Sequence, residues 1–185
     1  SGVINVKEIR NGEQQSKADG MVTQKKGIVL GILTADCAPV LFAEPSSGII
    51  GACHAGWRGA LSGIVPKTVN AMENMGAMRK RIIAAIGPCI GQRSYEVGSD
   101  FKEKFLEKDK DYEKFFQSVG STLAHFNLPG FVEWQLQVSG VTKHDRIKTD
   151  NFLDENILYS YRRMIKNDQS DYGRGLSAIM IKDET

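Results

Sequence analysis

Residues 27–59 read GIVLGILTADCAPVLFAEPSSGIIGACHAGWRG, and the fold expected for the chain follows from this stretch. The run 27–33 is apolar and rich in branched side chains, which predicts a short, buried β-strand. Two further apolar runs, 39–43 and 48–54, flank the turn-forming letters EPSS and predict a β-hairpin. The stretch therefore predicts three consecutive strands.

The rest of the chain alternates helical and strand-like patterns. Apolar residues at three- and four-residue steps predict a helix over 61–75, with a kink or restart at Pro66 because proline removes a backbone hydrogen bond. The other expected elements are a buried strand at 81–86, helices at 100–107 and 131–138, a short strand at 143–148 and an alternating strand at 175–181. The chain has no internal repeat or linker. It is therefore expected to be α/β (mixed α+β), a single layered domain of mixed β-sheets flanked by helices over 1–185.

The composition excludes several classes of partner. The 185 residues are 41% hydrophobic and 25% charged, as in an ordinary globular protein. The formal net charge is only +2, from 24 basic and 22 acidic residues. Such a balanced charge predicts that neither a nucleic acid nor a membrane surface is a partner. The sequence leaves the oligomeric state open.

The cysteines and the apolar runs indicate the compartment. Cys37, Cys53 and Cys89 are odd in number and lie in apolar runs instead of the short, loop-rich spacings of a disulfide framework. No apolar run approaches the ~20 residues that a membrane-spanning helix needs. The first residues also lack the charged-then-apolar pattern of a signal peptide. We therefore expect a cytoplasmic protein.

Cys37 and His54 are the first candidates for chemistry. They are separated by the expected hairpin, so the sulfur and an imidazole nitrogen can converge on one point. A catalytic zinc site has three protein ligands and an open position, with sulfur at about 2.3 Å and nitrogen at about 2.0 Å from the metal. Neither His125, ahead of the letters FNLP, nor His144, in a charged stretch, repeats the strand-end position of His54. The pair predicts a metal centre whose third ligand is not evident.

Two other interpretations of this pair remain open. In one, Cys37 is a nucleophile and His54 is its base, because an adjacent imidazole can lower the pKa of a thiol. In the other, the pair is a buried cysteine and a hydrogen-bonded core histidine, which is the commoner arrangement. A metal needs both side chains and a third ligand, whereas a dyad needs only mutual contact and an oxyanion site.

Three more residues are candidates for catalytic roles. Arg58 follows His54 by four residues at an expected helix start, where a guanidinium and free backbone amides suit a phosphate, although a surface salt bridge is equally compatible. Asp36 precedes Cys37 and reaches the site only if the chain turns there, since strand neighbours face opposite sides. Cys89 is either a second site residue or a small buried hydrophobic residue.

Five strings of residues also occur together in a known order. They are TADCAPVLF at 34–42, HAGWRG at 54–59, IGPCIG at 86–91, YEVG at 95–98 and SYRR at 160–163. In this order they resemble the laccase-domain family, which is also called the polyphenol oxidase or purine nucleoside phosphorylase family. Each string is weak by itself, but the combination is specific, and the resemblance runs from about Ala18 to Ile181.

The resemblance implies a site as well as a fold of layered sheets and helices. It implies a metal bound by two histidines and one cysteine, of which Cys37 and His54 are the matching cysteine and second histidine. The family's first histidine lies in a Gln-x-His string ahead of the segment that matches ADGMVT at 18–23, and this sequence has no such string. We therefore expect that the chain lacks the family's extreme amino-terminal segment. At 150–151 the chain has Asp-Asn where the family often has Cys-Thr or Asp-Thr, so a substrate contact is expected to differ.

The resemblance also implies an activity on purine nucleosides. The implied reactions are phosphorolysis of adenosine, inosine or methylthioadenosine, and deamination of adenosine, with zinc as the cofactor and copper as a possible replacement. In this interpretation Arg58 suits the attacking phosphate. Three alternatives stay open. The first is a copper-dependent phenol oxidase, for which three histidines are few. The others are a cysteine-dependent hydrolase that edits peptidoglycan precursors, and a binding module without enzymatic activity.

Overall fold

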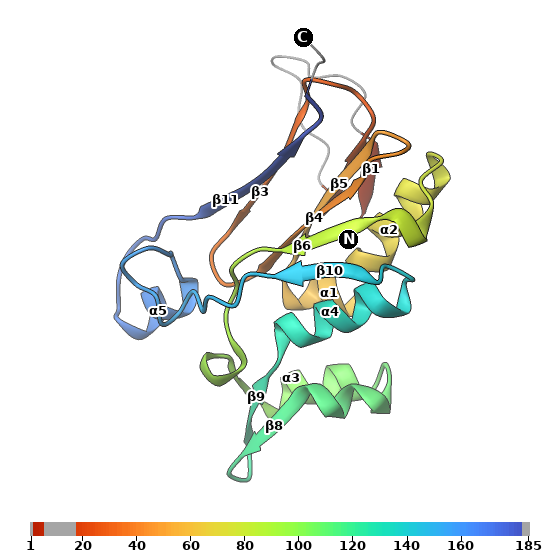
Figure 1. Cartoon of the computed structure of the whole chain (residues 1–185). Helices are drawn as coiled ribbons and strands as arrows, with labels where there is room; N and C mark the ends of the chain where they lie inside the picture. Colours follow the sequence, from red (N-terminus) through yellow and green to blue (C-terminus); the bar gives the residue numbers. More distant parts are fainter. Residues whose placement is uncertain (1, 6–17, 183–185) are drawn as a thin grey trace.

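The computed structural model describes residues 2–5 and 18–182 (Figure 1). The strands are β1 (Val3–Asn5), β2 (Gly20–Thr23), β3 (Val29–Thr34), β4 (Ala38–Glu44), β5 (Ile49–Ala55), β6 (Ile83–Ile86), β7 (Glu96–Gly98), β8 (Phe116–Val119), β9 (Leu123–Phe126), β10 (Lys143–Arg146) and β11 (Gly175–Met180). The helices are α1 (Trp57–Leu61), α2 (Ile64–Asn74), α3 (Ser99–Leu106), α4 (Leu128–Val138) and α5 (Tyr161–Lys166), with 3₁₀ turns η1 (Arg79–Arg81), η2 (Gln92–Ser94) and η3 (Lys110–Phe115). No helix in the described ranges is both long and apolar enough to cross a membrane.

The elements form layers around a six-stranded sheet. Its strand order is β1-β2-β5-β4-β6-β10, with antiparallel pairing in the centre and parallel pairing of β1 and β10 to their neighbours. Helices α2 and α4 pack against this sheet, and the antiparallel ribbon of β3 and β11 contacts its strands β4 and β5 (Figure 1). This arrangement confirms the predicted mixed α/β fold of layered sheets and helices.

The side chains of the central strand β4 point alternately to the two faces of the sheet, and this alternation explains the layers. Val40 and Phe42 are fully buried in the core that includes the helices, whereas Leu41 and Ala43 pack in a second core with residues of the ribbon. Successive side chains of a strand point to opposite faces, so a strand covered on both faces is apolar at nearly every position. The continuous apolar run in this part of the sequence therefore reflects two cores, one on each side of the sheet.

The ribbon corrects one prediction. The run 27–33 was expected to form a buried strand, but in β3 only alternate residues are buried. Leu30 is 1% exposed, while Val29 and Leu33 are 53% and 58% exposed. The reason is that β3 pairs with β11 outside the main sheet, so only one of its faces meets the described part of the chain. Strand β6, also predicted to be buried, likewise leaves Ile83 47% exposed.

The helix predicted over 61–75 corresponds to α2, and a separate short helix, α1, precedes it and ends at Leu61. The break lies at Gly63, whose φ of 79° is in the left-handed region that favours glycine. The predicted interruption at Pro66 was therefore misplaced. Pro66 lies in the first turn of α2, where a backbone N–H has no helical partner and a proline is tolerated. The predicted end of the helix at residue 75 is confirmed to within one residue, because α2 finishes at Asn74 and Gly76 follows with a φ of 107°.

The remaining predicted elements are present with shifted ends. Helix α4 begins at Leu128, ahead of the predicted range, because the Asn127 side chain caps it by accepting a hydrogen bond from the Gly130 amide at 2.9 Å. Strands β6, β10 and β11 and helix α3 lie within or beside their predicted ranges. The sequence analysis missed β1, β2, β7, β8, β9 and α5. Each of these spans six residues or fewer, which is too short for a clear periodic pattern.

Aromatic side chains from α3, η3, β9 and α4 form a cluster. Figure 1 shows α3 and β9 below α4 in this view. The Phe105 ring centroid lies 4.7 Å from that of Phe126 and 5.4 Å from that of Phe131. Phe131 also contacts Trp134 of the same helix, at 5.7 Å between centroids. This cluster fixes α4, whose first residue, Leu128, reaches the wall of the main cavity.

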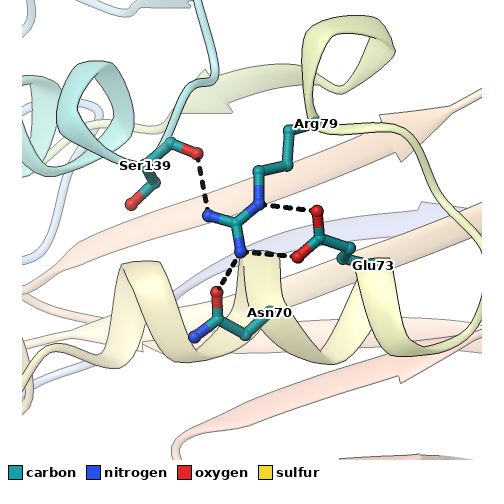
Figure 2. Close-up of polar contacts among 4 residues, drawn as sticks. All are labelled: Asn70, Glu73, Arg79 and Ser139. Carbon is teal, nitrogen blue, oxygen red and sulfur yellow. Dashed lines mark hydrogen bonds and ion pairs between the residues drawn. The ribbon is translucent and has the colours of Figure 1, made fainter.

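A polar network ties the carboxyl end of α2 to that of α4 (Figure 2). The Arg79 Nε and Nη2 atoms donate to the Glu73 carboxylate at 2.8 and 2.6 Å. Nη2 also donates to Asn70 Oδ1 at 2.7 Å, and Nη1 donates to the Ser139 carbonyl at 3.3 Å. Because Arg79 and Glu73 are solvent-exposed, this network contributes mainly to the orientation of the two helices and little to stability.

Replacing Phe131 by alanine tests the structural role of the aromatic cluster. Phe131 is 0% exposed, so Phe131→Ala is expected to lower the free energy of unfolding by about 3–5 kcal/mol. Val138→Ala on the same helix is the control, because Val138 is 61% exposed and its loss should cost at most about 0.5 kcal/mol. Denaturant titration followed by circular dichroism gives both values. Equal losses in the two variants would contradict the assignment of this core.

Candidate functional site

A cavity of about 900 Å³ opens where strands β3 and β5 end. Its wall combines the polar side chains that the sequence singled out with aromatic and cationic residues from the carboxy-terminal segment. The lining residues are Asp19, Leu33, Thr34, Ala35, Asp36, Cys37, His54, Gly56, Trp57, Arg58, Gly59, Ser62, Ile90, Tyr95, Leu128, Tyr161, Arg162, Tyr172 and Arg174. Four of the five predicted site residues are thus in one cavity.

The pairing of β4 with β5 places Cys37 and His54 together. Ala38 is the register partner of Ala55, so Cys37, one residue earlier, lies beside Gly56. A Cβ atom built on Gly56 would lie 2.9 Å from Cys37 Sγ and 3.3 Å from His54 Cε1. The sulfur and the imidazole ring therefore surround a single point, and a glycine is required there because any side chain would occupy it.

Burial controls the protonation of both side chains. Burial, and secondarily the neighbouring Asp36, raise the pKa of the Cys37 thiol to about 11. Burial also lowers the pKa of His54, although the charge of Asp19 opposes this effect. A neutral imidazole beside a protonated thiol is not an ion pair that activates a nucleophile. A bound metal cation would reverse the effect of burial on Cys37, because ligation to a metal favours the thiolate over the protonated thiol.

The donor set fits part of a metal site. A thiolate and a neutral imidazole are ligands that zinc and copper both accept. Across residues 2–5 and 18–182, however, no three His, Cys, Asp or Glu side chains are placed to hold one metal ion. His125 lies on β9 and His144 on β10, and neither lines the cavity. The described residues therefore supply two donors, and a three-ligand catalytic site needs one more.

Asp36 reaches the cavity because the chain turns at this residue. Its φ is 85°, a left-handed conformation that is uncommon for a residue other than glycine. The carboxylate is 9% exposed, and its Oδ2 atom accepts a hydrogen bond from the Arg162 amide at 2.6 Å. In the described structure, Oδ1 is buried without a hydrogen-bond partner. Burial raises the pKa of Asp36, while the Arg162 amide and the Ser160 hydroxyl lower it.

Arg163 braces the segment that holds Asp36. Its Nη1 atom donates to the carbonyls of Asn151 and Phe152 at 2.6 and 3.0 Å, and its Nη2 atom donates to the carbonyl of Leu158 at 2.5 Å. The guanidinium thus ties the loop before α5 to the helix itself. Its neighbour Arg162 supplies the amide that binds Asp36, so this brace extends to the wall of the cavity.

Arg58 lies where the sequence predicted it, in the first turn of α1. This helix has only five residues. The guanidinium carbon of Arg58 lies 4.4 Å from the centroid of the Trp57 ring. Stacking on an indole restrains the side chain and leaves the N–H groups at the edge of the guanidinium available. The side chain is exposed and lines the cavity, so it can meet an anion there.

Cys89 is near this cavity without lining it. It is 4% exposed, forms a β-bridge with Asp150 and lines a separate cavity of about 220 Å³. Burial raises the pKa of its thiol to about 12. Cys89 therefore has the environment of a small buried side chain. A catalytic role for Cys89 stays a prediction.

Several wall residues were not singled out from the sequence as parts of the site. Tyr95 and Tyr161 belong to the strings YEVG and SYRR, so the resemblance contained a signal for them. Tyr172 and Arg174 belong to no string. They reach the cavity because Gly175, which follows them, pairs with Thr34 at the end of β3. This long-range pairing leaves no local pattern in the sequence.

The fold and the cavity define an α/β protein whose main cavity brings a cysteine thiol and a histidine imidazole together, and comparison with known proteins specifies its family. The model of the family described as multi-copper polyphenol oxidoreductase laccase matches residues 1–182. The structure of a Neisseria meningitidis protein has a TM-score of 0.80 and 28% identity, covering 90% of this chain and 65% of that one. The chain belongs to the multi-copper polyphenol oxidoreductase laccase family, as the resemblance predicted. The family name suggests that the site depends on a metal.

Two curated relatives carry names of purine enzymes. Purine nucleoside phosphorylase RC0672 of Rickettsia conorii is 39% identical over 168 residues, which cover 90% of this chain and 69% of that protein. Adenosine deaminase RL5, from an unknown prokaryotic organism, is 39% identical over 114 residues, which cover 62% of this chain and 37% of that protein. The match therefore leaves about a third of the Rickettsia protein unaligned.

The point between Cys37 and His54 can be tested by filling it. Gly56→Ala is expected to weaken zinc binding at least about tenfold, because the new methyl group would displace the sulfur or the imidazole from a shared metal. Titration calorimetry with zinc measures the affinity. Gly98→Ala is the control, since a Cβ there meets no atom within 4 Å. Unchanged zinc affinity in Gly56→Ala would show that the two side chains do not share an ion.

Proposed function

We propose that this protein is a purine nucleoside phosphorylase that acts on adenosine, inosine or methylthioadenosine and also deaminates adenosine. The observation that carries the proposal is one cavity of about 900 Å³ that contains the Cys37–His54 pair and the Arg58 guanidinium. The name of the Rickettsia conorii relative supports purine nucleosides as the substrate class, and the name of adenosine deaminase RL5 supports adenosine.

Arg58 is proposed to bind the attacking phosphate. In phosphorolysis a phosphate oxygen forms a bond to the ribose carbon C1′, and the bond from C1′ to the purine nitrogen breaks with its electron pair remaining on the base. The dianion must therefore be held next to the ribose and away from water. Arg58 suits this role because it forms no ion pair in the described part of the chain and is held against Trp57.

Asp36 is proposed to bind the polar edge of the purine. Its Oδ1 atom is buried and has no hydrogen-bond partner in the described structure, while Oδ2 is held by the Arg162 amide. An unpaired polar atom in a buried position is costly, so a ligand that supplies its partner gains affinity. The side chains of Trp57, Tyr161 and Tyr172 line the same cavity and offer aromatic faces for the base.

Cys37 and His54 are proposed to hold zinc, with copper as a possible replacement. When bound, zinc supplies a Lewis acid that makes water or a substrate oxygen more acidic. The third ligand is proposed to be a histidine ahead of the segment that matches 18–23, as the family resemblance implies. Strand β1 supports this position, because the Gly2 carbonyl accepts hydrogen bonds at 3.1 Å from the amides of Asp19, which lines the cavity, and of Gly20.

The role of Cys37 can be measured with a matched cysteine as control. Zinc-supplemented protein is expected to release adenine from adenosine only when phosphate is present, and to form inosine, as chromatography of the products will show. Cys37→Ala is expected to lower both rates at least about a hundredfold through loss of a metal ligand. Cys53→Ala should retain them within about threefold, because Cys53 belongs to the core that contains the helices.

Two results would count against this proposal. If folded, zinc-bound protein formed neither adenine nor inosine, the purine assignment would be wrong. A cysteine-dependent hydrolase would then be the leading alternative. If Cys37→Ala kept the activity of the parent, the reaction would take place elsewhere.

Asp168 is a matched control for Asp36, because these are the two aspartates with a positive φ among the residues that the structure describes. Asp36→Asn is expected to lower kcat/KM for adenosine at least about tenfold, because the amide changes the hydrogen-bonding character of the buried Oδ1 position. Asp168→Asn should have no effect beyond about twofold, since Asp168 is exposed. Steady-state kinetics on both variants gives the comparison. Equal values for Asp36→Asn and the parent would remove Asp36 from the site.

A further inference from the structure

The cavity contains more positive charge than a nucleoside and one phosphate require. Three guanidiniums line it, from Arg58, Arg162 and Arg174, against the two carboxylates of Asp19 and Asp36. None of the three arginines forms an ion pair in the described part of the chain. Arg162 has a structural role, because its Nη1 atom donates to the Glu96 carbonyl at 2.8 Å. Arg58 and Arg174 are thus the two guanidiniums available to a ligand.

Arg174 is held in place by aromatic contacts. Its guanidinium carbon lies 4.8 Å from the centroid of the Tyr172 ring, and its Nη2 atom donates to the Tyr172 hydroxyl at 3.2 Å. The Tyr172 ring in turn meets the Tyr161 ring edge to face, at 5.2 Å between centroids. A guanidinium restrained in this way loses less conformational entropy when it binds an oxyanion.

The two available guanidiniums come from different parts of the fold. Arg58 belongs to α1, directly after β5, whereas Arg174 precedes Gly175, the partner of Thr34 in the ribbon. A phosphate bound by Arg58 alone during phosphorolysis would leave the Arg174 guanidinium without a ligand. The cavity volume of about 900 Å³ is at the upper end of the range for small-molecule sites, so it has room for a substituent beyond the nucleoside.

We propose that Arg174 and Tyr172 form a subsite for a phosphate group carried by the substrate, so that the cavity accepts nucleoside 5′-phosphates as well as nucleosides. The subsite rests on the proposed function, since it assumes a nucleoside in the same cavity. Arg174 binds the phosphate ester by charge-assisted hydrogen bonds, and Tyr172 orients the guanidinium. Free inorganic phosphate offers the same chemistry, so the test must separate the two sources.

Binding of AMP, adenosine and inorganic phosphate, each measured by titration calorimetry, tests the subsite. The parent is expected to bind AMP at least about tenfold more tightly than adenosine. In Arg174→Gln this ratio should fall to about one, and in Tyr172→Phe it should fall partly, because the ring remains and the hydroxyl is lost. Arg93→Gln is the matched control, since Arg93 is exposed and lines neither cavity, and it should keep the ratio of the parent.

The outcomes separate this subsite from the proposed function. Equal affinities for AMP and adenosine in the parent, or an unchanged ratio in Arg174→Gln, would overturn the subsite. If Arg174→Gln no longer bound inorganic phosphate but kept the parent's ratio of AMP affinity to adenosine affinity, Arg174 would be a site for the free anion. The proposed subsite would then also be wrong. If the ratio behaved as expected while adenosine gave neither adenine nor inosine, the subsite would stand and the proposed reaction would fall.

Discussion

The register between β4 and β5 is the constraint on which the site depends. Ala38 pairs with Ala55 and Pro39 with His54, and this pairing puts Cys37 beside Gly56. A slip of one residue would turn His54 to the opposite face of the sheet and separate it from the sulfur. Close packing opposes such a slip, because each face of β4 and β5 fits its own core and a slip would exchange the side chains of the two faces. The packing of the molecule therefore also fixes the geometry of the candidate metal ligands.

The cavity forms where the two cores meet the end of the ribbon. His54 shares its face of β5 with Ile50 and Ala52, which pack against the ribbon. The chain leaves the ribbon through the turn at Asp36, and the segment around α5 then closes one side of the cavity. Arg163 joins that segment to the loop before it through backbone carbonyls. The position of Asp36 thus depends on contacts between parts of the chain that are distant in sequence.

The fold was predictable from the sequence for strands that have long apolar runs and are covered on both faces. The strands of the hairpin appear as predicted because β4 and β5 are buried on both faces, so their apolar runs are continuous. The same pattern misled for β3, since an apolar run does not reveal that a strand lies in a two-stranded ribbon with one face exposed. The break predicted within the helical segment was also misplaced. A glycine with positive φ, and not the proline, ends the first helix.

The sequence by itself determined the family, the layered α/β fold and the pairing of Cys37 with His54, because one hairpin joins the strands that carry these two residues. Only the tertiary structure decided which other side chains share their cavity. Asp36 enters through a left-handed turn, Cys89 remains outside, and Arg174 enters through the pairing of Gly175 with Thr34. The physical reason is the range of the contacts. Short hairpins follow from adjacent apolar runs and turn residues, whereas strand pairings and loop contacts across the chain depend on the packing of the complete core.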